Sequence, residues 1–141
     1  MIALGLKNLG FIPLDDFIVE DHGDGQVLAA WLSAQPQPSS QEIEDAALLG
    51  PIPTLDDYRR AIQSHVDATP QQRAYDSGVT CSSYVNSTNP TWAAEAAAFV
   101  AWRDAVWAYA YTELAKVEGG TRPQPSVADI VAELPAMVWP A

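Results

Sequence analysis

One segment constrains the fold more than any other, because residues 90–118 form a single predicted helix that is apolar around its whole circumference. Asn89 and Pro90 are a strong start signal, since asparagine caps helices and proline suits the first turn. Gly119 and Gly120 predict its end. At a rise of ~1.5 Å per residue the helix is roughly 42 Å long, and its many alanines favour helix formation.

Apolar side chains occur on every side of this predicted helix. They are Trp92, Ala96, Phe99, Val100, Trp102, Val106, Trp107, Tyr109, Tyr111 and Leu114. A helix that is apolar all round has to be covered all round. Two interpretations follow: either the rest of the chain wraps the helix as a central core element, or another molecule completes the cover. Exposed aromatic patches of the second kind mark protein contacts.

The other predicted elements are shorter. Residues 17–19 and 26–28 flank a turn rich in aspartate and glycine, which predicts a β-hairpin. Ser39, Thr54 and Ser126 are each followed three positions later by an acid, the signature of a helix-capping box. They predict helices over 40–49 and 55–68 and a final helix that ends near residue 134. A further turn is expected over 71–78, and residues 80–89 are expected to form a polar connection.

These elements predict an α+β fold that is mainly α, with a small N-terminal β-hairpin region followed by a helical domain with one long central helix. We expect a β-hairpin segment at 1–33, a Pro-rich linker with a short helix at 34–53, and a helical domain at 54–141. The helical domain contains the long helix 90–118 and an apolar C-terminal tail. A length of 141 residues suits one folded domain that needs no disulfide or metal.

Charge and cysteine content exclude several classes of function. The formal net charge is −11, which disfavours nucleic acid and anionic membranes as partners. The single cysteine excludes an internal disulfide framework and a cysteine-based zinc site. The longest apolar stretch contains Glu95, Arg103 and Asp104, which argues against a membrane span. We expect no signal peptide at the N-terminus and a cytoplasmic setting where the chain is made.

No set of residues has the spacing of a catalytic or metal site. The aspartates around the predicted hairpin lack the pattern of a calcium loop. His22 and His65 lie far apart in the sequence, and Cys81 has no third group to orient a nucleophile and base. We therefore expect no catalytic residue, no cofactor and no metal. Arg103 lies among tryptophans and needs a carboxylate partner, for which Asp76 or Glu95 is expected.

A family resemblance is carried by motifs in both halves of the chain. A hairpin with an Asp-Gly turn is followed by Trp31 and by Pro-Gln-Pro-Ser at 36–39 with Glu42 and Ile43. The C-terminal half carries Tyr75-Asp76, Cys81-Ser82-Ser83-Tyr84, Ser87-Thr88-Asn89-Pro90, Ala94-Glu95-Ala96, Ala101-Trp102-Arg103-Asp104-Ala105-Val106-Trp107 and Leu134-Pro135-Ala136-Met137-Val138-Trp139-Pro140. In this order the motifs resemble those of small phage tail-fibre assembly proteins and related small tail proteins of phages and prophages.

The resemblance implies a protein that helps the tail fibre trimerise or that stays attached to it. The implied partner is the tail-fibre protein, with self-association or a baseplate protein as further options. The implied location is the host cytoplasm during assembly, or the virion tail if the protein is retained. The expected partner-binding residues are Trp92, Phe99, Trp102, Trp107, Tyr111, Met137, Val138 and Trp139.

Two alternatives to an assembly chaperone remain open at this point. The protein could stay in the virion as a structural connector between fibre and baseplate, since both roles need the same kind of surface. An enzyme of the tail tip, such as a wall or polysaccharide hydrolase, would need two carboxylates in different environments. Asp76 with Glu95 is the candidate pair for that chemistry.

Overall fold

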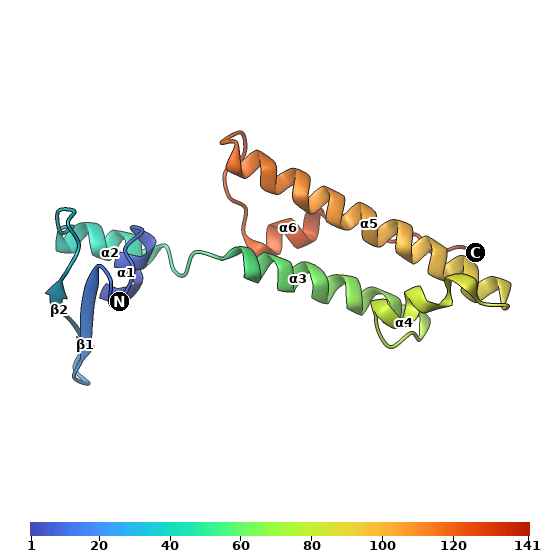
Figure 1. Cartoon of the computed structure of the whole chain (residues 1–141), viewed down its shortest axis with the longest axis horizontal. Coiled ribbons are helices and arrows are strands. Elements are labelled where there is room, and N and C mark those ends of the chain that lie inside the picture. The colour runs from blue at the N-terminus through green and yellow to red at the C-terminus, as the bar shows by residue number, and fades with distance from the viewer. The chain divides into compact units, whose positions relative to one another are not determined.

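The computed structural model describes residues 1–141 and divides into two compact units, Met1–Ile52 and Pro53–Ala141. Each unit has its own hydrophobic core, and no core residue is shared between them. Figure 1 shows that the only strands lie in unit 1 and that unit 2 is entirely helical. The fold is therefore α+β and mainly α, as the sequence predicts.

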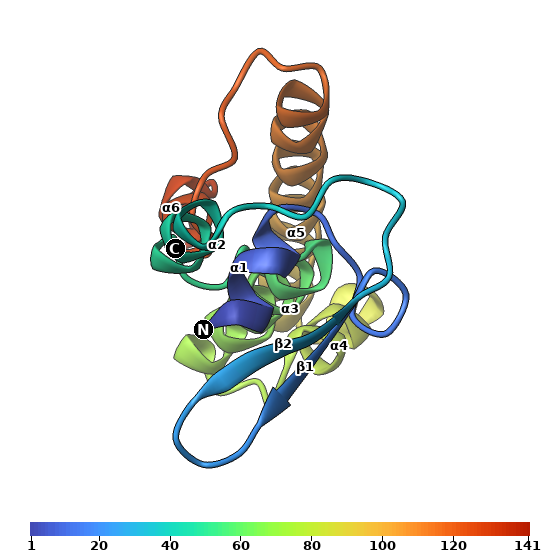
Figure 2. The same cartoon turned by 90° about the vertical axis from the view of Figure 1, so that its left-hand side faces the viewer.

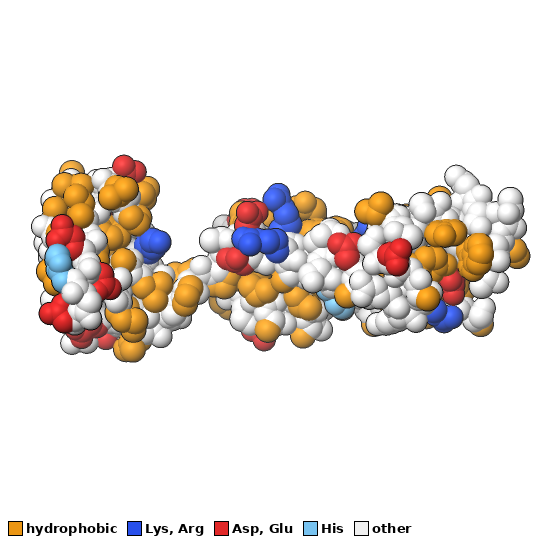
Figure 3. Space-filling view, turned by 90° about the horizontal axis from the view of Figure 1, so that it is seen from below, with side chains coloured by type: hydrophobic (Ala, Val, Ile, Leu, Met, Phe, Trp, Pro, Cys, Tyr) orange, Lys and Arg blue, Asp and Glu red, His pale blue; other side chains and the backbone are white.

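Unit 1 consists of two helices and one hairpin: α1 (Ile2–Asn8), β1 (Phe17–Asp21), β2 (Gln26–Trp31) and α2 (Ser40–Leu48). The predicted hairpin is confirmed, with β1 and β2 antiparallel and joined by the loop visible in Figure 2. Leu6, Phe17 and Ile43 form the small core. On the face seen in Figure 3, acidic side chains gather on unit 1 around its single histidine.

Sequence patterns did not predict α1, which lies inside the segment 1–33 that was expected to hold only a hairpin. This helix has no side-chain cap, so its sequence carries no start signal. Packing specifies it instead: at Gly5 an added Cβ would lie only 2.0 Å from the carbonyl oxygen of Ile43. Because α2 packs on α1 this closely, the segment 34–53 is not a separate linker region, and its helix belongs to unit 1.

Unit 2 contains α3 (Leu55–Ala68), η1 (Thr69–Arg73), α4 (Gly78–Ser82), η2 (Ser83–Asn86), α5 (Pro90–Glu118) and α6 (Val127–Glu133). In Figure 1, α3 and α5 run in opposite directions, with α6 between them near the C-terminal end of α5. α6 packs against α3, whereas α4 and η2 pack against the N-terminal half of α5.

The helix boundaries follow the caps that the sequence contains. Capping boxes at Ser39, Thr54 and Ser126 are all formed, and the Asn89 side chain accepts from two backbone amides at the start of α5. The helices over 55–68 and 90–118 are confirmed at both ends. The helical turn expected over 71–78 forms earlier, as η1 over Thr69–Arg73 with Pro70 in its first turn. The polar connection expected at 80–89 is wrong, because Ser77 caps α4 by accepting from the Thr80 amide and η2 follows directly.

The core of unit 2 lies along one face of α5. Ala96, Phe99, Trp102 and Val106 are buried, and their spacing of three and four residues places them on a single stripe. The three large side chains among them pack with residues of α3, of the loop before α4, of α4 and of the C-terminal segment, namely Ile62, Val66, Tyr75, Cys81 and Leu134. Much of the opposite face of α5 consists of exposed alanines. The helix is thus apolar all round in composition, while its large side chains are covered mostly by the chain itself.

Candidate protein-binding groove

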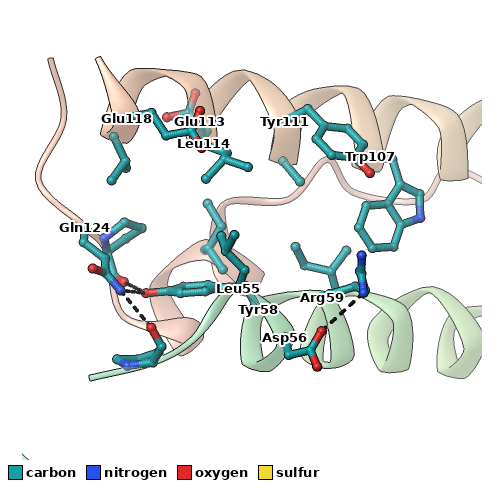
Figure 4. Close-up of a pocket in the computed structure, with 16 residues that line it drawn as sticks. Leu55, Asp56, Tyr58, Arg59, Trp107, Tyr111, Glu113, Leu114, Glu118 and Gln124 are labelled. Atoms are coloured by element: carbon teal, nitrogen blue, oxygen red, sulfur yellow. Dashed lines mark hydrogen bonds and ion pairs between the residues drawn. The ribbon is translucent and has the colours of Figure 1, made fainter. Parts of the chain in front are cut away.

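The C-terminal half of α5 and the N-terminal half of α3 leave an open groove of about 670 Å³ between them. From α3 it is lined by Leu55, Tyr58, Arg59 and Ile62, and from α5 by Trp107, Tyr111, Leu114 and Val117. Ile130 of α6 and Pro125 in the loop before it complete the apolar lining. Figure 4 shows Trp107 and Tyr111 on α5 facing Leu55, Tyr58 and Arg59 on α3.

Helical periodicity explains why these residues meet. Positions 55, 58, 59 and 62 follow the i, i+3, i+4, i+7 pattern on α3, and positions 107, 110, 111 and 114 follow it on α5. The apolar stripe of α5 therefore continues beyond Val106, but α3 does not cover this part. Leu55 is 64% exposed and Tyr111 is 65% exposed, so the groove walls present large apolar surfaces to solvent.

One end of the groove is held by hydrogen bonds between α3 and the loop before α6. The Tyr58 hydroxyl donates to the Pro125 carbonyl at 2.5 Å. The Gln124 amide nitrogen donates to the Pro53 carbonyl and to the Tyr58 hydroxyl, both at 3.1 Å. Figure 4 shows these contacts beside Gln124. They fix the position of the loop, so this end of the groove has a defined shape.

An ionic network fixes the turn between α5 and α6. Glu113 accepts from Lys116 at 2.5 Å and from Arg122. Arg122 also donates to both carboxylate oxygens of Glu133 at 2.7 Å, and the Tyr109 hydroxyl donates to Glu133 at 2.8 Å. Hydrogen bonds from Lys116 and then Arg122 lower the pKa of the Glu113 carboxyl, and hydrogen bonds from Arg122 and then Tyr109 lower that of Glu133. The network keeps α6 in place beside the groove.

The structure brings two of the expected partner-binding residues, Trp107 and Tyr111, together in the groove, where their rings lie 6.2 Å apart. Phe99 and Trp102 are instead buried in the core of unit 2. Their side chains stabilise the fold and leave no surface for a partner, because the chain's own C-terminal segment and α3 cover them. Trp92 lies outside the groove, half exposed, with its ring 5.7 Å from that of Tyr84.

The apolar tail was expected to bind a partner, and it lies mainly against the core of its own unit. Met137 and Trp139 pack on that core, while Val138 points to solvent. Trp102 Nε1 donates to the Pro135 carbonyl at 2.7 Å, and the Arg73 guanidinium lies 5.7 Å from the centre of the Trp139 ring. The tail therefore closes the core of unit 2, and Val138 is its one large apolar side chain that stays exposed.

The ion pairs beside the long helix differ from the predicted pairing of Arg103 with Asp76 or Glu95. Buried Glu95 accepts from the Tyr75 hydroxyl at 2.7 Å and pairs with Arg73 at 3.4 Å. Arg103 pairs with its neighbour Asp104 at 2.8 Å, so its expected pairing with Asp76 or Glu95 is wrong. Glu95 lies eight residues away along α5 and is already engaged by Tyr75 and Arg73.

The carboxylate pair considered for hydrolysis is not assembled as a site. Asp76 is exposed, and its backbone carbonyl accepts a hydrogen bond from the Gln71 side chain. Glu95 is already engaged by Tyr75 and Arg73.

No three side chains of His, Cys, Asp or Glu are arranged to hold a metal ion. None of the helices combines the length and apolar character needed to span a bilayer.

Sequence reasoning missed the α3 wall of the groove. Leu55, Tyr58, Arg59 and Ile62 lie at helical spacing on one face of α3, and this spacing alone does not distinguish a core face from a groove wall. One feature of the sequence indicates an uncovered surface there: the apolar stripe of α5 runs on to Val117, farther than the short α6 can cover.

Comparison with protein-family models, with curated proteins and with solved structures found no match.

Proposed function

We propose that this protein acts by binding another protein through the groove between α3 and α5. The observation that carries the proposal is the open groove of about 670 Å³ with exposed Leu55 and Tyr111 on its walls. Grooves lined by aromatic and aliphatic side chains, with a few polar groups at the ends, are typical of helix and peptide recognition. Monomeric proteins seldom leave such apolar surfaces open unless they serve a contact.

The partner we propose is a phage tail-fibre protein, whose assembly this chain assists as a chaperone or to which it stays attached. The resemblance of the motif order to small tail-fibre assembly proteins supports that partner. Fibre subunits expose apolar stripes and unpaired strand edges before they trimerise, and such surfaces aggregate. A small partner that covers an apolar segment suppresses this, and a net charge of −11 keeps the complex soluble.

Co-expression with the adjacent tail-fibre gene tests the proposal. We expect the fibre protein to become more soluble and trimeric in the presence of the full chain, and the two to copurify. Tyr111→Glu should reduce copurification, because it puts a charge on the groove wall without disturbing the core. The matched control is Val79→Glu on α4, which changes a side chain that is 78% exposed and outside the groove.

Two results separate the alternatives. A fibre protein that is equally soluble and trimeric without this chain, and that never copurifies with it, contradicts the proposal. If the complex forms, mass spectrometry of purified particles distinguishes a permanent connector, which stays in the virion, from a chaperone, which leaves.

A further inference from the structure

The groove has three walls made of helices and one open side. α3 and α5 form its two long walls, and Ile130 of α6 lies between them as part of the lining. The stretch of α5 that lines the groove, residues 107–118, spans roughly 16 Å at ~1.5 Å per residue. That is about three turns of helix. The missing fourth side therefore matches a short helix lying lengthwise, as in a four-helix bundle that lacks one member.

The two ends of the groove differ in charge: one carries Glu118, and the other carries Arg59 together with Asp56. Figure 4 places Glu118 at one end and Arg59 with Trp107 at the other. Arg60 lies near the same Trp107 end, where the surface continues beyond the groove. An occupant with a basic group toward Glu118 and an acidic group toward the two arginines would complement both ends of the groove.

Of the charged groups at the two ends of the groove, Glu118 is the one that most clearly lacks a partner. Glu118 makes no ion pair in the structure, because the nearby cations Lys116 and Arg122 both pair with Glu113. It is also the last residue of α5, and a negative charge at a helix C-terminus is unfavourable because the backbone carbonyls already make that end negative. A cation from a partner would relieve both effects.

The arginines at the opposite end remain available to a partner. Arg59 pairs with Asp56 at 3.2 Å and Arg60 with Asp57 at 3.5 Å. All four side chains are largely exposed, and exposed pairs of this kind are weak because water screens them. An incoming carboxylate can therefore compete for the guanidinium groups beside the Trp107 and Tyr111 rings.

A second copy of this chain fits the groove poorly. Two copies joined by a two-fold axis would place one concave surface on the other and leave a void, whereas a stable interface needs close packing. Two molecules that each carry a net charge of −11 also repel one another. A single helix from a different protein can fill the concave surface without leaving a void, and it need not carry a large negative charge.

We propose that the groove binds an amphipathic helix of about three turns from the partner protein, with a basic residue facing Glu118 and an acidic residue facing Arg59 and Arg60. The proposal rests on the proposed function and specifies the chemistry of its partner segment. The apolar face of that helix, at i, i+3, i+4 and i+7, lies against Trp107, Tyr111 and Leu55.

Binding of labelled synthetic peptides to the full chain, followed by fluorescence anisotropy, tests this proposal. The probes share one leucine face and differ only at their ends: the first has an acid at one end and a lysine at the other, the second has acids at both ends, and the third has the leucines replaced by serine. We expect the first peptide to bind about fivefold more tightly than the second, the effect of one partly exposed ion pair. The third should not bind.

Variants of the chain make the test specific. Glu118→Lys should reverse the preference, so that the peptide with acids at both ends binds more tightly. Tyr111→Glu should weaken binding of the first peptide by about tenfold or more, as expected for loss of a well-packed aromatic anchor. Val79→Glu is the matched control and should change nothing.

Three results overturn the inference. The first is equal binding of the two leucine peptides by the wild type and by Glu118→Lys. The second is binding that survives Tyr111→Glu. The third is self-association of the full chain, in sedimentation at the peptide-binding concentrations, that Tyr111→Glu abolishes. If the fibre protein still copurifies in any of these cases, the proposed function stands with a different contact; if peptides bind as expected but the fibre does not, the proposed function fails instead.

Discussion

Glu95 shows how a single residue organises the core of unit 2. Its carboxylate is only 7% exposed and lies on the buried face of α5, among aromatic residues. Tyr75 donates to one of its oxygens, and Arg73 pairs with the other. Arg73 in turn lies over Trp139 of the C-terminal segment. Through these contacts Glu95 links α5, the segment after η1 and the tail.

Replacement of Glu95 by alanine should lower the free energy of unfolding of unit 2 by about 1–3 kcal/mol. The loss arises because the buried Tyr75 hydroxyl keeps no acceptor. Denaturant unfolding followed by circular dichroism measures it, with Glu118→Ala on the same helix as the control. Equal stability of the Glu95→Ala variant and the control would contradict a structural role for this carboxylate.

Cys81 should be chemically inert in the folded protein. Its side chain is fully buried, and burial, followed by the nearby charge of Glu95, raises the pKa of the thiol to about 11. Because the thiolate is the reactive form, a thiol-specific reagent at about pH 8 should react slowly with the native chain and fully in denaturant. Rapid reaction under native conditions would show that the core of unit 2 opens readily.

At the scale of elements, the sequence predicts best where a local signal and a long-range contact agree. Ser39, Thr54, Asn89 and Ser126 define helix starts by side-chain hydrogen bonds within a few residues, so a single sequence contains all the information needed. α1 has no such signal and depends on close packing of Gly5 on α2. That contact joins residues far apart in the sequence and could not be predicted.

The sequence predicts the α5 wall of the groove but not the α3 wall, because the groove also depends on contacts between residues far apart in the sequence. An apolar stripe shows that a helix face is covered, but not by which element. Phe99 and Trp107 look alike in sequence, yet α4 and the tail cover the part of α5 that holds Phe99, while the short α6 leaves Trp107 at an opening. Which aromatic residues form the core and which form the surface is decided by the lengths and positions of the neighbouring helices.

The network around Arg122 should make unit 2 less stable in acid. The folded state lowers the pKa values of Glu113 and Glu133 below the ordinary value of 4.5. The stabilisation is therefore complete above that value and is lost as the pH falls through the lowered values, where both carboxylates become protonated. Unfolding free energies measured between about pH 7 and pH 3 should show this decline, and Arg122→Gln should flatten it. An unchanged pH dependence in that variant would contradict the assignment.

At the scale of the whole molecule, the two cores predict two independent folding units. The buried apolar residues of Met1–Ile52 reach only to Ala47, and those of Pro53–Ala141 begin at Ile62. A fragment of residues 53–141 should retain cooperative thermal unfolding at the temperature seen for unit 2 in the full chain. A fragment that lacks helical structure would show that unit 2 depends on unit 1. The very small core of unit 1 makes it the less stable of the two.

The charge of the chain is also divided unequally. Lys7 is the only lysine or arginine of unit 1, whereas unit 2 carries the other six, including Arg59 in the groove. Unit 1 therefore supplies most of the net negative charge that favours solubility, and unit 2 supplies the apolar groove. This division suits a protein that holds an apolar segment of another chain while remaining in solution.

Site-specific photocrosslinking with the proposed partner, the tail-fibre protein, tests the groove contact most directly. A photoreactive phenylalanine derivative replaces Tyr111 in one full-length protein and Val79 in another, and each is irradiated with the fibre protein. A contact through the groove predicts a crosslinked complex from position 111 and none from position 79, with the fibre attachment point in a helical segment that has charged residues at both ends. Crosslinking from position 79 alone, or from neither position while the two proteins still copurify, would contradict a contact through the groove.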